Sequence, residues 1–313
     1  MHVLLAIDGS SCADRARDLV ARLPWPDGTA IAVVSVVDDV AAFGLPLVVP
    51  SEHARLEMEA AINREVESVL ESTARVVERP GVTVDARVLH GRAGTAIVEA
   101  ATALGADLVV VGSRGHSQLA SMLLGSTSDE VVDHAPCPVL VVRDSEIDEV
   151  VLGADGSPGA THAEAVLGGW PILRGLPVTV AAVAETAIPF NAGMAAGLYD
   201  VVIESYVRDV DTARAEAQEL ADRVAARLQR SGVAAVAHVM EGEASTELVA
   251  FAHPRKHPLI VVGSRGQSGI ARLLLGSVAR NVLHHATGSV LVVRENVTVK
   301  REREGAAAPA AAG

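Results

Sequence analysis

Glycine and serine residues with the spacing G-x-x-G-x9-G-S occur twice in this 313-residue chain. Each set follows a short run rich in valine and precedes an apolar run of helical length, which is typical of a strand, a loop and a helix N-terminus. Backbone N–H groups in such a loop approach a phosphate closely, and the helix N-terminus adds unpaired donors and a partial positive charge. The pattern therefore predicts a polyphosphate site in each half, at Gly112, Gly115, Gly125 and Ser126, and at Gly263, Gly266, Gly276 and Ser277.

These residues also have a purely structural interpretation, in which the first glycines form a turn and Gly-Ser starts a helix. The recurrence of the pattern favours binding, because segments 108–143 and 259–294 agree at more than half of their aligned positions and share the turn GSRG. A glycine at Gly112 or Gly263 would leave no Cβ in front of a phosphate and would permit backbone angles closed to other residues.

An acidic residue ends the first strand-like run of each half, Asp8 in HVLLAIDGS and Asp155 in EVVLGADGS. Its carboxylate could accept a hydrogen bond from a ribose hydroxyl, or hold a Mg²⁺ that arrives with phosphates. It could equally be the N-cap of the helix that follows. The two interpretations have equal weight.

Other polar residues give weaker signals. Arg114 and Arg265, inside the glycine turns, either reach a phosphate or point to solvent. His90 has no counterpart in the second half and is a weak site candidate, whereas His134 and His285 lack the cysteine or carboxylate spacing of a metal site and are interpreted as surface or packing residues. Neither half contains the G-x4-G-K-[ST] lysine that draws on a transferred phosphate, which predicts nucleotide binding with slow or absent hydrolysis.

The elements that must position these residues alternate between strand and helix. Nearly continuous Val, Leu and Ile runs indicate a parallel sheet covered on both faces, so each half is predicted to be a doubly wound α/β domain with ligands at the carboxyl ends of its strands. We expect strands in the first half at 2–7, 30–37, 82–89, 107–111 and 138–142, with helices at 11–22, 53–78, 94–104 and 126–134. In the second half we expect strands at 149–154, 177–183, 233–240, 258–262 and 289–293, and a helix-rich stretch at 204–231.

The repeat of this series of elements predicts two domains, 1–145 and 146–297. The composition of residues 298–313 predicts a disordered tail. The net charge is −13 and the lysines are Lys256 and Lys300, which disfavours a nucleic-acid surface. Apolar runs are too short for a membrane span, and Cys12 and Cys137 are interpreted as buried, idle thiols. We expect a soluble cytoplasmic protein.

Taken with Asp8 and the closing runs PVLVVR and SVLVVR, the glycine pattern resembles that of the ATP-binding universal stress proteins, and two copies resemble their tandem-domain members. The resemblance implies five parallel strands per domain in the order 3-2-1-4-5, bound ATP, possible Mg²⁺, and a role in the stress response rather than in metabolism. It implies that Asp8 and Asp155 lie beside the nucleotide and that Val36 and Val183 contact adenine. It places the phosphates at the glycine–serine residues named above and at the backbone of Thr127 and Val278.

Oligomeric contacts follow from the last strands, Val139–Val142 and Val290–Val293, which would be sheet edges in that order. Pairing between them would make an internal pseudo-dimer, and the resemblance also implies a homodimer. The segments that hold Phe43 and Phe190 differ between the halves and are candidate surfaces for an unidentified regulatory protein partner or lids over adenine, although packing of these rings onto their own domain is the favoured interpretation. Two alternatives remain open: a hydrolase or transferase with one catalytic and one regulatory site, and a dimerisation module without ligand.

Overall fold

The computed structural model describes residues 1–37, 52–115, 124–185, 199–266 and 275–294. The predictions for Phe43, Phe190 and the tail at 298–313 lie outside these residues. The first half contains β1 (His2–Ala6), α1 (Ser11–Arg22), β2 (Thr29–Val37), α2 (Glu52–Val77), β3 (Val82–His90), α3 (Ala93–Leu104), β4 (Leu108–Gly112), α4 (Ser126–His134) and β5 (Val139–Val142). The second contains β6 (Glu149–Gly153), α5 (Pro158–Gly169), the short η2 (Pro171–Leu173), β7 (Val178–Ala184), α6 (Tyr199–Arg230), β8 (Ala235–Glu241), α7 (Ala244–Ala252), β9 (Pro258–Gly263), α8 (Ser277–His285) and β10 (Ser289–Val293).

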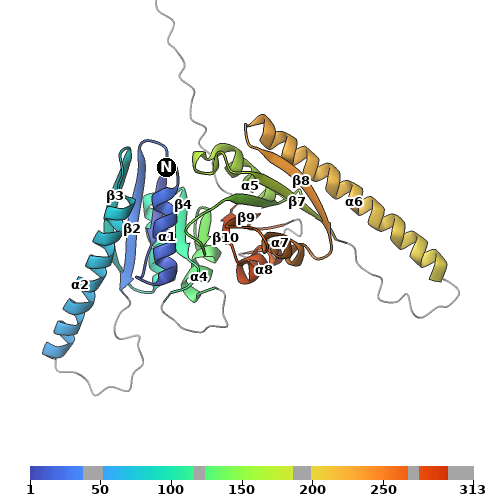
Figure 1. Ribbon diagram of the computed structural model, residues 1–313. Helices are drawn as coiled ribbons and strands as arrows, with labels where there is room; N and C mark the ends of the chain where they lie inside the picture. The colour runs from blue at the N-terminus through green and yellow to red at the C-terminus, as the bar shows by residue number, and fades with distance from the viewer. Residues whose placement is uncertain (38–51, 116–123, 186–198, 267–274, 295–313) are drawn as a thin grey trace, which may run out of the picture.

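The strands form one ten-stranded sheet in the order β3-β2-β1-β4-β5-β10-β9-β6-β7-β8. Each half has the predicted order 3-2-1-4-5 with parallel neighbours, so the doubly wound α/β class is confirmed. The halves meet where β5 pairs with β10 in the antiparallel sense, Leu140 opposite Leu291. The predicted pairing of the two last strands therefore exists, and it joins both domains into a single sheet (Figure 1).

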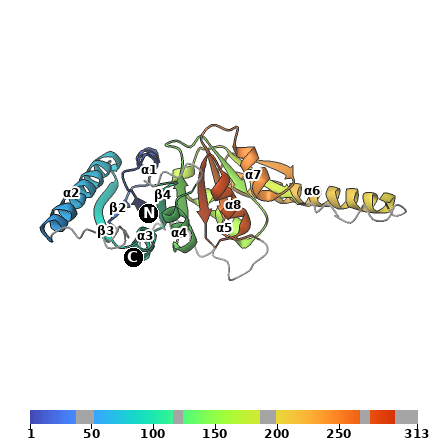
Figure 2. The same cartoon turned by 90° about the horizontal axis from the view of Figure 1, so that it is seen from below.

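Helices cover both faces of this sheet, as buried strands rich in Val and Leu require. Residues of α1, α2, α5 and α6 pack into the core of one face, and residues of α3, α4, α7 and α8 into the core of the other. Both cores draw residues from the two halves, so apolar packing continues across the junction. The long helices α2 and α6 lie at opposite ends of the molecule, and α6 extends beyond the sheet (Figure 2).

Two arginines at the ends of the last strands hold the junction together. Arg143, after β5, donates to the carbonyl oxygens of Leu283 and Gly288 in the second half. Arg294, after β10, donates from Nη2 to the carbonyl oxygen of Val132 at 2.7 Å, and to that of Asp133, in the first half. Each guanidinium thus satisfies at least one carbonyl group in the last turn of the other domain's last helix, where the helix dipole favours a cation.

Replacing Arg294 with methionine is expected to lower the free energy of unfolding by about 1–3 kcal/mol, because it removes the donor to carbonyls beside buried Val132. Urea unfolding followed by circular dichroism measures the change. Arg22→Met is the control, since Arg22 makes an exposed ion pair with Glu146 that is worth less than about 1 kcal/mol. Equal effects of the two substitutions would show that the contacts of Arg294 across the junction stabilise the fold no more than an exposed ion pair does.

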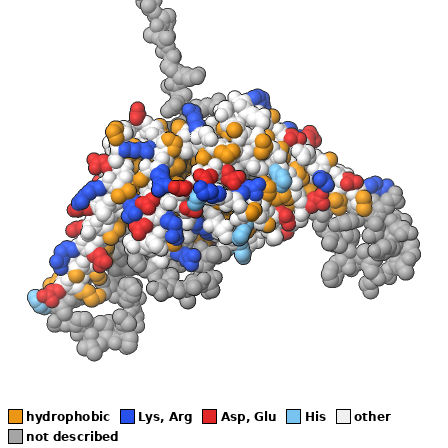
Figure 3. Space-filling model, viewed as in Figure 1, with side chains coloured by type: hydrophobic (Ala, Val, Ile, Leu, Met, Phe, Trp, Pro, Cys, Tyr) orange, Lys and Arg blue, Asp and Glu red, His pale blue; other side chains and the backbone are white. Residues whose placement is uncertain are grey.

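The surface carries interspersed charges. On the face seen in Figure 3, Lys and Arg side chains alternate with Asp and Glu rather than forming a basic stripe. Every helix of the described residues is too short or too polar to cross a bilayer. Both cysteines are buried, and burial raises the pKa of the Cys137 thiol to about 12, which keeps it protonated and unreactive.

Candidate functional site

The topology brings the carboxyl ends of three strands together in each half. In the first, β1 lies between β2 and β4, with Ala6 opposite both Val34 and Val111. Asp8 lies two residues after the end of β1, Val36 lies near the end of β2, and Gly112 ends β4. The second half repeats this arrangement with Asp155, Val183 and Gly263 around β6. These predicted residues therefore share one edge of the sheet, at the point where the strand order reverses.

A serine that the sequence analysis did not single out organises the turn after β1. Ser10 is the N-cap of α1, where its Oγ accepts from the Ala13 N–H at 3.2 Å and donates to the Arg114 carbonyl at 3.2 Å. The carboxylate of Asp8 accepts from the Ser10 N–H at 2.9 Å. Asp8 is therefore not the helix cap. It fixes the turn, and Ser10 ties that turn to the glycine-rich one.

The second half makes the same contacts with its own residues. Ser157 caps α5 through the Ala160 N–H at 3.1 Å and donates to the Arg265 carbonyl at 3.3 Å, and Asp155 accepts from the Ser157 N–H at 2.9 Å. The signal for this role was present in the sequence as Asp-Gly-Ser in both halves. It became interpretable once the structure placed the glycine turn against the serine.

Gly112 and Gly263 are required for helix packing. A Cβ at Gly112 would lie 2.8 Å from the Cys12 carbonyl carbon, and one at Gly263 would lie 2.3 Å from that of Gly159. Neither residue has a positive φ, so the expectation that these glycines adopt angles closed to other residues is wrong. They allow the first turns of α1 and α5 to approach the ends of β4 and β9.

Gly115 and Gly266 instead face the acidic residues. A Cβ at Gly115 would lie 2.6 Å from Asp8 Oδ2, and one at Gly266 would lie 2.9 Å from Asp155 Oδ2. Each glycine turn therefore passes directly over the carboxylate at the end of the first strand. The intervening loop residues, 116–123 and 267–274, lie outside the described residues.

Helices α4 and α8 begin at this edge with open N-termini. Their N-cap residues are Gly125 and Gly276, whose N–H groups donate to the Ser113 and Ser264 carbonyls at 2.8 and 2.7 Å. Among the described residues, no side chain caps either helix. Exposed Ser126 and Ser277, followed by half-buried Thr127 and Val278, are the first helical residues, so their N–H groups are the orphan donors of a helix N-terminus.

Positive charge gathers beside the first of these turns. Arg114 is half-buried, and its Nε is buried with no hydrogen-bond partner among the described residues. Burial, together with the neighbouring charge of Arg114, lowers the pKa of the Arg143 guanidinium to about 10. The positive charges of Arg114 and Arg143 repel each other, and an anion bound between these arginines and the start of α4 would relieve that repulsion.

The other candidate residues are valines that pack on the core and histidines that contact their own helices. Val36 and Val278 are half-buried and pack on the core, and Val183 is half-buried on β7. His134 and His285 each contact the carbonyl oxygen four residues earlier in their helices. In the part of the chain that is described, no group of three His, Cys, Asp or Glu residues is arranged to hold a metal.

Together the fold and these turns define a tandem α/β protein in which each half presents an open helix N-terminus and a carboxylate at its switch point. The chain belongs to the universal stress protein family, whose model matches residues 1–143 and 146–294. A universal stress protein of Mycobacterium tuberculosis is 27% identical over 315 residues, which cover 95% of this chain and 98% of that one. Another, of Thermus aquaticus, is 37% identical over 143 residues, 45% of this chain and 97% of that one.

A solved structure shares the fold over nearly the whole length. A universal stress protein from Archaeoglobus fulgidus aligns with a TM-score of 0.63 and 18% identity, covering 94% of this chain and 98% of that one. The names of these relatives refer to stress and specify no reaction.

Proposed function

We propose that this chain is an ATP-binding regulatory protein of the stress response, with one nucleotide site in each domain and slow or no hydrolysis. One observation carries the proposal: in both halves an uncapped helix N-terminus and a carboxylate lie at the same edge of the sheet. In both halves a serine hydroxyl, of Ser10 or Ser157, ties the turn that holds the carboxylate to the glycine turn. Helix packing alone explains Gly112 and Gly263, but it does not explain why Gly115 and Gly266 pass over an acidic side chain.

In the first domain, the phosphates would bind the N–H groups of Ser126 and Thr127 and the Ser126 hydroxyl, with Arg114 alongside. Asp8 would accept from a ribose hydroxyl or hold a Mg²⁺ through water, and Val36 would lie against adenine. The second domain offers the equivalent Ser277, Asp155 and Val183. There Val278 replaces Thr127, so one hydroxyl fewer is available to the phosphates.

Weak hydrolysis follows from the groups at this edge. A water-activating base needs a free lone pair in reach of the attacking water. Asp8 and Asp155 each use one carboxylate oxygen to hold a turn, and Glu185, the carboxylate that follows β7, accepts a hydrogen bond from the Ala244 N–H at 3.2 Å. The proposal is therefore a nucleotide-dependent binding protein rather than a hydrolase or transferase.

A cytoplasmic homodimer and a regulatory protein partner complete the proposal. Because β5 and β10 pair within the chain, the outer strands of the described sheet are β3 and β8. A homodimer would therefore use those strands or helix surfaces, rather than the last strands.

The direct test is to purify the protein natively, denature it, and identify and count the released nucleotide by mass spectrometry. We expect close to two adenine nucleotides per chain, since both turns are built alike. Protein released without nucleotide that also fails to bind added ATP, with and without Mg²⁺, would refute the proposal and favour a ligand-free dimerisation module.

A further inference from the structure

The two domains differ on the sheet face that α3 and α7 cover. In the second domain, Phe251 of α7 stacks on His238 of β8, with ring centroids 4.4 Å apart. Arg255 Cζ lies over the same ring, 3.5 Å from its centroid, and Arg255 also pairs with Glu149 at 3.2 Å. An aromatic ring thus fills the space between the helix and the outer strands.

The first domain lacks this ring. Ungapped alignment and strand register place Ala100 where the second domain has Phe251, Arg87 in place of His238, and Leu104 in place of Arg255. A groove of about 210 Å³ is lined by Arg87 and Leu104, the counterparts of His238 and Arg255, and by Ala30, Ala32 and Ala106.

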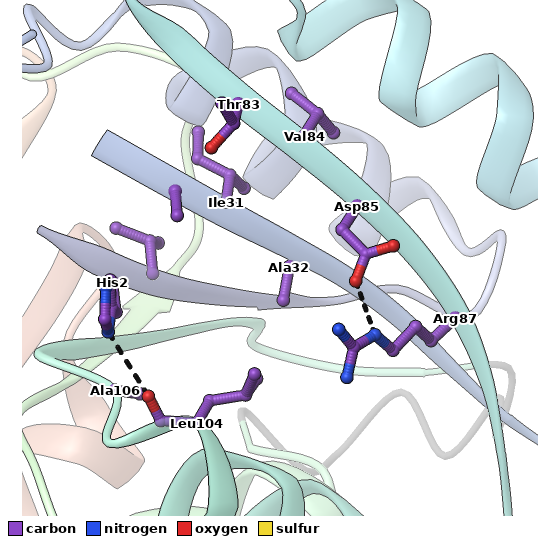
Figure 4. Close-up of a pocket in the computed structure, with 11 residues that line it drawn as sticks. His2, Ile31, Ala32, Thr83, Val84, Asp85, Arg87, Leu104 and Ala106 are labelled. Atoms are coloured by element: carbon purple, nitrogen blue, oxygen red, sulfur yellow. Dashed lines mark hydrogen bonds and ion pairs between the residues drawn. The ribbon is translucent and has the colours of Figure 1, made fainter. Parts of the chain in front are cut away.

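The groove has an apolar floor and a charged side. Figure 4 shows the side chains of Ala32, Arg87 and Leu104 pointing toward one another across it. Asp85 accepts from Arg87 Nε and so orients the guanidinium, while His2 Nδ1 lies 3.3 Å from the Leu104 carbonyl at the far side. The lining residues His2, Ala30 and Thr83 lie at or next to the first residues of their strands, so the groove lies away from the edge that carries Asp8.

We infer that this groove binds a small planar aromatic molecule, held between the Arg87 guanidinium and the Leu104 side chain as Phe251 is held in the second domain. The positive guanidinium complements the negative face of an electron-rich ring, and the alanine floor removes apolar ring surface from water. The volume suits one or two fused rings, since a cavity of about 150 Å³ is enough for benzene. The second domain supplies its own ring, so it needs no ligand there.

Titration of ¹⁵N-labelled protein with indole tests this site. We expect saturable shifts of the Ala32 and Leu104 amides in the wild-type protein. Ala100→Phe supplies the missing ring and should weaken indole binding at least tenfold. Ala103→Phe adds the same ring at an exposed position of the same helix and should leave binding unchanged. Absence of saturable shifts in the wild type, or equal binding by the two variants, would overturn the inference.

The reverse substitution, Phe251→Ala, should open an equivalent groove in the second domain. Phe251→Ala, once shown by circular dichroism to unfold cooperatively, should acquire indole-induced shifts at His238 beside those at Ala32. A folded Phe251→Ala protein without indole-induced shifts at His238 would contradict the equivalence of the groove in the first domain and the site of Phe251 in the second. A parallel titration with N-acetylphenylalanine amide represents a side chain from a partner protein. Binding of that amide without binding of indole would overturn the assignment to a free small molecule.

Discussion

The Ser126→Pro/Ser277→Pro protein is expected to fold normally and to lose most of its nucleotide. Proline is tolerated at the first position of a helix, and it removes both the N–H and the hydroxyl that each serine would offer to a phosphate. Hydrogen bonds to charged groups are worth about 1.5–3 kcal/mol, so each site should bind ATP roughly 10- to 100-fold more weakly. Isothermal titration with ATP, beside the count of nucleotide retained on purification, measures this loss.

The backbone is suited to this substitution. The residue before a proline must be extended, and Gly125 (φ −81°, ψ 152°) and Gly276 (φ −69°, ψ 157°) already are. Helix α5, which starts with Pro158 after its Ser157 cap, shows that this chain accepts proline at a helix start. Unchanged ATP affinity in a folded double variant would exclude the starts of α4 and α8 as phosphate sites. Single variants assign the remaining affinity to one domain or the other.

The second large effect concerns stability. Gly263→Ala should lower the free energy of unfolding by about 3 kcal/mol, because its Cβ would lie 2.3 Å from the carbonyl carbon of Gly159 and 2.7 Å from the nitrogen of Ala160. Both atoms are backbone, so relief requires the first turn of α5 to move away from β9. Urea unfolding monitored by circular dichroism gives the difference.

Gly125→Ser is the matched control for that measurement. A Cβ at Gly125 meets its nearest atom at 3.4 Å, φ is negative, and serine is a good N-cap, so stability should change by only a few tenths of a kcal/mol. Equal stability of Gly263→Ala and Gly125→Ser would show that α5 does not pack as described. The contrast also means that substitutions at Gly112 or Gly263 are poor probes of nucleotide binding, since they would lose ligand by losing the fold.

Sequence reasoning predicted the larger elements well because their signals are local. Valine-rich runs predicted each strand to within a few residues, and the repeat predicted both domains. The helix expected from residue 204 begins at Tyr199. Helices α5 and α7 had no separate prediction, and at 12 and 9 residues both are short, so their helical periodicity is a weak signal. The pairing of β5 with β10 was predicted from the family order, since two apolar edge strands need cover.

Roles that depend on contacts between distant residues were less accessible. The phosphate role predicted for Gly112 stays a prediction, and the structure adds a packing role against Cys12 and Ala13 that the sequence did not indicate. Ser10 was passed over, although it joins two turns more than a hundred residues apart. A glycine or serine in a loop has the same local pattern whether a helix, a carboxylate or a ligand lies beside it.

By itself, then, the sequence determined the α/β class, the duplication, and the strand ends at which Asp8, Asp155 and the glycine turns lie, because hydrophobic periodicity and turn residues act over a few positions. The tertiary structure alone decided which glycine meets a helix and which meets a carboxylate. It also decided that Arg143 and Arg294 each donate to carbonyl groups of the other domain, and that Phe251 packs against His238 and Arg255. Those outcomes depend on which surfaces the folded chain brings within a few ångströms, and no short stretch of sequence encodes that proximity.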